Sequence, residues 1–246
     1  TDADDKRFTV SKRKILTPQV LFDTSKKEML NPSQGYKKFV GKLKNRYKCE
    51  INKSELNLKT LKKANMLLLG GPRLPFTAQE LQDIRKYIED GGRVVITMAE
   101  GGENKLNTNV NAMLEQVGIS VNSDSVVRKT FHKYLHPKEA FLEMDASRMS
   151  CQVSNKVANN FRACSGKKEE DDKKPGKYSR KYRDTNDEAN NRDEFGGLKF
   201  VYPYGSTLNV RKPACSLLSS GPISFPANRP VGAFYMSLKR GKLFVM

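Results

Sequence analysis

The sequence predicts an α/β domain built on an open, mainly parallel sheet flanked by helices. Two short apolar runs, 66–69 and 94–98, are typical of strands that are buried on both faces. An amphipathic helix lies between them, as a right-handed parallel crossover requires. The last third of the chain, 198–246, contains closely spaced apolar runs between Pro and Gly turns, so we expect it to be β-rich and to extend the same sheet.

The first predicted elements are a strand over 19–22 and an amphipathic helix over 35–47. The apolar stripe of this helix faces the core, and lysines surround it. Residues 48–51 then fit an edge strand, and residues 54–63 fit a short helix with two leucines inward.

The crossover helix begins at a capping box formed by Thr77 and Glu80, and its apolar residues repeat at helical spacing. Gly91 and Gly92 end it. A further helix is predicted over 108–117, with Gly118 as its C-terminal stop.

Short strands complete the predicted domain. They cover 119–121, 125–127, 198–202, 208–210, 215–218, 223–225, 231–236 and 243–246. We expect one domain over 18–246, incomplete at its C-terminal end, because the chain stops within an apolar run. Residues 1–17 are predicted to form a mobile tail. The segment 166–194 is rich in charge and nearly free of aliphatic residues, which predicts a disordered insert.

The carboxyl ends of the predicted strands give one candidate ligand site. Ligands of open α/β sheets bind at this edge, and double glycines there allow close backbone approach to an anion. The residues concerned are Asp23, Gly70, Gly71, Arg73, Glu100 and Gly101. A sugar or nucleotide would fit this chemistry, although the phosphate-loop motifs GxGxxG and GxxxxGK[ST] are absent and double glycines are more often turn formers.

Catalytic and metal sites find less support in the sequence. A hydrolase or amidotransferase needs a nucleophile at a strand-to-helix turn, and no Ser or Cys follows the runs 66–69 or 94–98 directly. His132 and His136 have the i, i+4 spacing of a helical metal site, but Pro137 makes the segment a poor helix. The four cysteines are far apart. We therefore expect no catalytic residues, cofactor or metal.

The net charge of +18 is unevenly distributed. Basic residues dominate 1–64, and 196–246 contains no Asp or Glu. The lysines of the 35–47 helix form a candidate docking face for an acidic partner, comprising Lys37, Lys38, Lys42, Lys44 and Arg46. Nucleic-acid binding is the second interpretation, and the chain lacks the aromatic pattern of RNA-binding sheets. No run of about 18 apolar residues is present, so we expect no membrane insertion.

Long motifs of this chain closely resemble the amino-terminal domain of the intraflagellar transport protein 52 family. They include GGPRLPFTAQELQDIRKYIEDGG, FHKYLHPKEA and FVYPYGSTL. The resemblance implies a glutamine-amidotransferase-like, Rossmann-like fold without enzymatic activity, shared with a bacterial gliding-motility transporter component. The charged insert at 166–194 departs from shorter family members.

The resemblance also implies a function. Members are core structural subunits of the intraflagellar transport B complex, which assembles cilia and carries cargo along ciliary microtubules. The expected partners are the other subunits of that hetero-oligomeric complex. The expected locations are the cilium or flagellum, the basal body and the cytoplasm. Small-ligand binding or a hydrolase-like activity remains the alternative.

Overall fold

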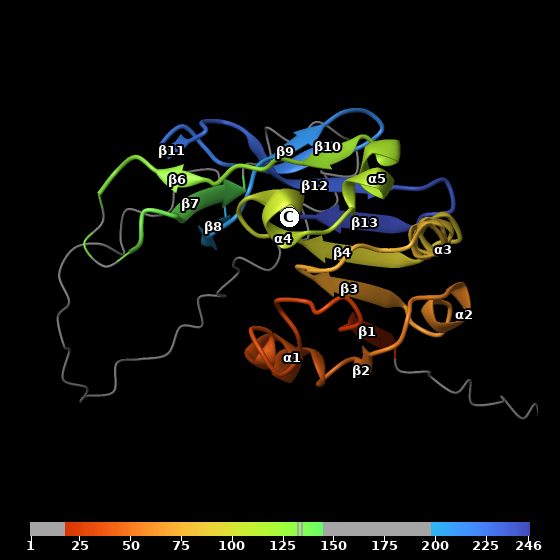
Figure 1. The fold of residues 1–246 in the computed structure, drawn as a ribbon. Coiled ribbons are helices and arrows are strands. Elements are labelled where there is room, and N and C mark those ends of the chain that lie inside the picture. The colour runs from red at the N-terminus through yellow and green to blue at the C-terminus, as the bar shows by residue number, and fades with distance from the viewer. Residues whose placement is uncertain (1–17, 132, 134, 145–197) are drawn as a thin grey trace, which may run out of the picture.

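The computed structural model describes residues 18–131, 133, 135–144 and 198–246. In these residues a central sheet of nine strands has the order β2-β1-β3-β4-β13-β12-β10-β7-β8 (Figure 1). The strands are β1 (Gln19–Asp23), β2 (Lys48–Asn52), β3 (Met66–Gly70), β4 (Arg93–Thr97), β7 (Glu139–Met144), β8 (Leu198–Pro203), β10 (Cys215–Ser219), β12 (Pro230–Met236) and β13 (Lys242–Val245). The predicted tail and charged insert lie outside the described residues.

The sheet has a parallel half and an antiparallel half. Strands β2, β1, β3, β4 and β13 are parallel, whereas β12, β10, β7 and β8 pair in antiparallel fashion. This confirms the predicted fold class, including a β-rich last third, most of whose strands join the same sheet. The final strand, β13, lies at the centre and joins β4 to β12.

The helices connect or follow the parallel strands β1 to β4. They are α1 (Lys37–Leu43), α2 (Leu58–Leu61), α3 (Ala78–Glu89), α4 (Gly102–Leu106) and α5 (Asn111–Leu114), followed by a 3₁₀ turn, η1 (Glu115–Val117). The predicted capping box of α3 is present. Glu80 donates its amide to Thr77 Oγ1 at 3.2 Å, and Thr77 donates its amide to Glu80 Oε2 at 2.8 Å.

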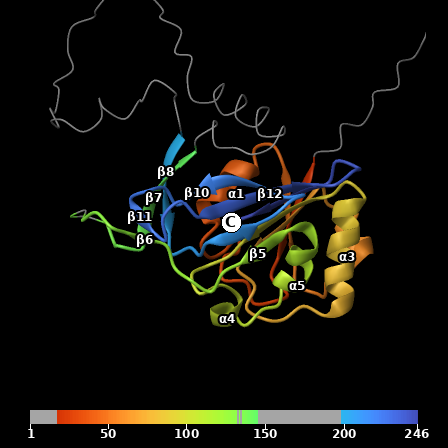
Figure 2. The same cartoon turned by 90° about the horizontal axis from the view of Figure 1, so that it is seen from above.

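Strand residues alternate between two cores, because successive side chains point to opposite faces. Val20, Phe22 and Leu68 pack with α1, whereas Leu67 and Leu69 pack with α3 and α5. Figure 2 shows α1 and α5 on opposite sides of the sheet. The parallel strands are therefore covered on both faces, as their continuous apolar runs predict.

Two short ribbons flank the sheet. Strand β5 (Ile119–Val121) pairs with β9 (Leu208–Val210), and β6 (Val127–Arg128) pairs with β11 (Ser224–Phe225). Among the described residues no helix combines the length and apolar character that a bilayer crossing needs.

Some predicted elements differ from the structure. The 108–117 helix starts only at Asn111, because the Asn109 side chain bonds both the amide and the carbonyl of Phe76. The 35–47 helix is limited to α1. Helix α4 and strand β7 were not predicted, since each is short and lacks a clear apolar period.

Candidate functional site

The carboxyl edge of the parallel strands is where the sequence places a ligand. Phe22 lies opposite Leu68, and Gly70 lies opposite Thr97, so Asp23 and the glycine pair follow neighbouring strands. The loop that leaves β1 crosses this edge. Leu30 donates its amide to the carbonyl of Gly70 at 2.8 Å, and Met29 donates to Gly71 at 2.9 Å. The chain's own backbone therefore lies against the glycines.

The glycines are required by this close approach. A Cβ on Gly70 would lie 2.1 Å from the carbonyl oxygen of Leu30. Gly71 has φ +69°, and its Cβ would lie 3.3 Å from Met29 Cβ. A residue with a Cβ would not fit at Gly70 without displacing the loop. The glycines thus have a packing role with respect to the loop 24–31.

Backbone amides that could bind an anion are used internally. Gly71 donates to Thr97 and Arg73 donates to Lys26, both at 2.9 Å. Glu100 donates to Tyr204 and Gly101 donates to Asp124, both at 2.7 Å. An anion at this edge would have to compete with these hydrogen bonds, and the exposed Arg73 side chain is the remaining cationic group of the predicted set. The ligand edge stays a prediction.

A buried polar cluster begins at Asp23. Asn52 Nδ2 donates to Asp23 Oδ1 at 2.7 Å, and Ser25 Oγ donates to Oδ2 at 2.8 Å. Glu28 is 5% exposed, and its Oε1 has no donor among the described residues. Burial, followed by the hydrogen bond with Asp23 and the charge of Asp23, raises the pKa of Glu28 to about 8. Burial beside Asp23 thus favours the protonated form of Glu28.

A buried ion pair ties the same loop to helix α3. Lys26 Nζ lies 2.7 Å from Glu80 Oε2 and 5.4 Å from the ring centre of Phe76. Glu80 Oε1 also accepts the amide of Leu56 at 3.2 Å. Burial opposes ionisation of Glu80, but the hydrogen bonds from Lys26 and from the amides of Thr77 and Leu56 outweigh it and lower the pKa of Glu80. The capping residue of α3 thus also anchors the β1 loop.

Glu100 occupies the strand-to-helix turn after β4, the position where an elbow nucleophile would stand. Hydrogen bonds from Lys105 and then Lys138 lower the pKa of Glu100 to about 2. Lys138 Nζ lies 2.6 Å from Oε2, and Ser125 Oγ donates to the same oxygen at 3.0 Å. Gly101, with φ +79°, turns the chain into α4. A carboxylate held by two ammonium groups is a poor base, and its interactions join α4 to the segment before β7.

The predicted docking face is exposed along and after helix α1. Within the described part of the chain its members make no ion pair; they are Lys37, Lys38, Lys42, Lys44 and Arg46. The opposite side of the helix anchors it to the sheet. Val40 is buried, and the hydroxyl groups of Tyr36 and Thr97 lie 2.8 Å apart. The structure therefore presents these basic residues on the exposed side of α1 and the turn that follows it.

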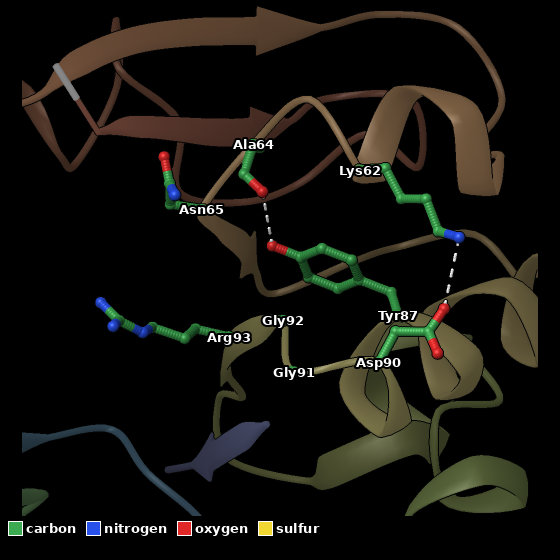
Figure 3. A pocket seen from close by; sticks show the side chains of 8 residues that line it. All are labelled: Lys62, Ala64, Asn65, Tyr87, Asp90, Gly91, Gly92 and Arg93. Carbon is green, nitrogen blue, oxygen red and sulfur yellow. Dashed lines mark hydrogen bonds and ion pairs between the residues drawn. The ribbon is translucent and has the colours of Figure 1, made fainter. Parts of the chain in front are cut away.

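Sequence reasoning missed an open hollow at the opposite, amino edge of the parallel strands. Its volume is about 610 Å³, and Figure 3 shows the residues that line it: Lys62, Ala64, Asn65, Tyr87, Asp90, Gly91, Gly92 and Arg93. The Tyr87 hydroxyl donates to the carbonyl of Ala64 at 2.9 Å. In Figure 3 the Tyr87 ring lies between Arg93 and Asn65 on one side and the ion pair of Lys62 with Asp90 on the other. One signal could have found this edge, since β2, β4 and β13 each begin with Lys or Arg.

His136 belongs to a different contact from the one that its spacing suggests. Its ring centre lies 5.3 Å from that of Tyr204, and its Nδ1 accepts the amide of Lys138 at 3.1 Å. His132 lies outside the described residues. In the part of the chain that the structure describes, no three metal-binding side chains come together.

Comparisons with known proteins identify the family. The model of the IFT52 GIFT domain matches residues 19–246. Two curated relatives, the intraflagellar transport protein 52 homologs of Homo sapiens and Mus musculus, are 39% and 38% identical over 95% and 93% of this chain. The chain spans about half the length of these relatives, 48% in each case.

Solved structures agree on the fold. The structure titled mmIFT52 N-terminal domain has a TM-score of 0.72 and 33% identity, with 93% of this chain and 85% of that chain covered. A ThuA-like protein from Bacteroides uniformis has a TM-score of 0.52 at 13% identity, covering 98% and 85% of the two chains, and shows the fold alone. With the family model matched over residues 19–246, this chain belongs to the IFT52 GIFT domain family.

Proposed function

We propose that this domain is a non-catalytic structural module of the intraflagellar transport B complex, needed for cilium assembly and cargo transport. The names of the curated relatives support a role in intraflagellar transport. In this role the domain acts in the cilium or flagellum and at the basal body, and it meets other subunits of the complex through its surface. Transport along microtubules requires a stable assembly. A sheet with a hydrophobic core on each face is a stable unit for such an assembly.

The observation that carries the non-catalytic role is the chemistry of the carboxyl edge. Glu100 replaces a nucleophile at the β4 turn and is neutralised by Lys105 and Lys138. The amides of Gly71 and Gly101 donate to the chain itself. Oxyanion stabilisation needs free donors aimed at the reacting atom. Among the described residues of this edge, none supplies both a nucleophile and such donors, so we assign the edge to the architecture of the domain.

Exposed lysines of α1 support a docking role. Lys37, Lys38 and Lys42 make no ion pair in the described residues, and Phe39, 43% exposed, adds apolar surface among them. Val40 is buried and anchors helix α1 to the sheet, so the lysines are presented from an ordered backbone. Charged side chains at the rim of an interface mainly steer association and select partners.

Rescue of cilium assembly tests the proposal. Full-length protein carrying Glu100→Gln is expressed in ciliated cells that lack the endogenous copy. If the domain is structural, this variant restores cilia whenever it accumulates to normal levels. A variant with normal abundance and normal binding to the complex, but without rescue, would point to chemistry at Glu100.

A ligand screen tests the alternative. The domain is heated with glutamine, simple sugars and nucleotides at millimolar concentration. We expect an unchanged melting temperature. A ligand at 100 times its dissociation constant would stabilise the fold by about 2.7 kcal/mol, so a reproducible rise would favour small-ligand binding and contradict a purely structural role.

A further inference from the structure

The amino edge of the parallel strands carries unpaired positive charge at fixed positions. Arg93 and Lys242 are the first residues of β4 and β13 and lie opposite each other in register. In-register residues of parallel strands face the same side and lie about 4.8 Å apart at the backbone. Both side chains are exposed, and neither makes an ion pair within the described residues. Two like charges are thus held side by side by the sheet itself.

The turn between β12 and β13 extends this surface. Ser237 Oγ donates to the carbonyl of Ile88 at 3.0 Å and accepts the amide of Gly241 at 2.9 Å. A Cβ on Gly241 would lie 1.7 Å from the same Ile88 oxygen, so the turn packs directly on the end of α3. Leu238 at its tip is fully exposed. The turn therefore exposes the apolar side chain of Leu238, while hydrogen bonds to the end of α3 hold its backbone in place.

Further cations surround the hollow of Figure 3. Lys62 and Lys239 share Asp90, each with an N–O distance of 3.3 Å, and their hydrogen bonds, that of Lys239 first, lower the pKa of Asp90. Lys63 and Arg240 are exposed and make no ion pair in the described residues. We call the four unpaired cations of this edge the basic rim, namely Lys63, Arg93, Arg240 and Lys242.

We propose that the basic rim docks an acidic peptide segment of another subunit, with Leu238 contacting an apolar side chain of that segment. This inference rests on the proposed structural role and names the surface and the partner's chemistry. Carboxylates of the partner would pair with Arg93 and Lys242, and Arg favours such pairing because its guanidinium binds carboxylates in a bidentate manner.

The same surface suits nucleic acid less well. Binding of single strands relies on exposed aromatic rings on which bases stack, and Tyr87, the ring in the hollow, is buried with its hydroxyl bound to Ala64. The exposed aliphatic Leu238 matches a peptide side chain better than a nucleotide.

Zero-length cross-linking tests the inference on the intact assembly. The full-length protein is isolated with its bound subunits from ciliated cells, and a carbodiimide joins lysine amines to contacting carboxylates. Peptides are then identified by mass spectrometry. We expect Lys63 or Lys242 to be joined to Asp or Glu of another subunit. Lys129 and Lys212, which are exposed and belong to neither basic surface, serve as internal controls.

The outcomes separate the two proposals. Cross-links from α1 alone would overturn docking at the basic rim while leaving the structural role intact. Isolation of the full-length protein without any other subunit would overturn the structural role and, with it, this inference. Loss of the bound material after nuclease treatment would show that nucleic acid occupies the surface and would overturn the peptide assignment.

A variant pair sharpens the same test. Arg93→Glu with Lys242→Glu should reduce subunit retention at least 10-fold. Lys129→Glu with Lys212→Glu, at exposed positions outside both the α1 docking face and the basic rim, should change retention less than 2-fold. Leu238→Ser, which removes the apolar contact without changing charge, should reduce it by a smaller factor. Thermal unfolding of each variant verifies that it is folded. Unchanged retention in a folded rim variant would contradict the proposal.

Discussion

The two edges of the parallel sheet use charge in opposite ways. At the carboxyl edge, Lys26, Glu28 and Glu80 are buried and bonded to one another or to the backbone. At the amino edge, Arg93 and Lys242 are exposed and have no internal partner among the described residues. The edge where related folds hold ligands therefore uses these charges to stabilise the domain, whereas the opposite edge leaves Arg93 and Lys242 available to a partner.

The largest effect is expected from Lys26→Met. Removing the cation leaves Glu80 buried without its partner, and breaking one member of a buried ion pair typically costs about 3 to 5 kcal/mol. We expect the free energy of unfolding, measured in urea, to fall by about this amount. Lys62→Met is the matched control, because its partner Asp90 is exposed. Similar losses in both variants would mean that the two edges do not differ as described.

Glu28→Gln should produce the next largest effect, and it should depend on pH. The folded pKa of about 8 lies above the ordinary value of 4.5 for a glutamate. The native state therefore retains a proton that the unfolded chain releases, and wild-type stability falls as pH rises from 4.5 to 8. Gln donates to Asp23 at every pH. The variant should gain on the order of 2 kcal/mol relative to wild type between pH 5 and pH 8.

Urea unfolding at pH 5 and pH 8 checks this prediction. Asp23→Asn is the control, because it removes the neighbouring charge that helps to raise the pKa of Glu28. A stability difference between Glu28→Gln and wild type that is the same at both pH values would show that Glu28 is ionised in the native state.

Glu100→Gln tests another carboxylate of the carboxyl edge. The pKa of Glu100 is lowered, whereas that of Glu28 is raised. The folded pKa of Glu100, about 2, lies below the ordinary value of 4.5, so its contribution to stability is present above pH 4.5 and is lost as pH falls toward 2. Glu100 is 13% exposed, and we expect a loss of about 1 to 2 kcal/mol at pH 7. The loss should shrink at pH 3. Urea unfolding at both pH values measures it, and an equal loss at pH 3 would contradict the ion-pair explanation.

The smallest effect on stability is expected at the basic rim. Lys242→Glu replaces a like-charge neighbour of Arg93 with an opposite charge, which should raise the free energy of unfolding by a few tenths of a kcal/mol. The same change should weaken subunit retention. Lys242→Gln controls for loss of the cation alone. A clear destabilisation by Lys242→Glu would indicate a structural role for the lysine.

Local patterns predicted the crossover correctly. The apolar runs of β3 and β4 and the Thr77–Glu80 capping box required only near neighbours in the sequence. The second role of Glu80, as partner of Lys26, depends on a loop 54 positions earlier, and no local pattern reports it. Glu28 lies in a polar segment that is typical of an exposed loop. Its burial follows from how Met29 and Leu30 pack on Gly71 and Gly70.

The amino edge shows the same limit. Basic residues at the starts of β2, β4 and β13 are visible in the sequence, but their meeting at one edge depends on strand order. Strand β13 was expected among the later strands, and only the fold brings Lys242 beside Arg93. Pairing partners about 150 positions apart are set by long-range packing, which hydrophobic periodicity does not encode.

The central place of β13 also has a consequence for biosynthesis. While the chain is being translated, β4 emerges long before the strand that covers its side. Until residues 242–245 leave the ribosome, β4 is an open, apolar strand edge, a kind of surface that promotes aggregation. At ordinary translation speeds this interval is on the order of 10 seconds. Nascent domains of this family are therefore expected to depend on chaperones that shield β4 until translation reaches β13.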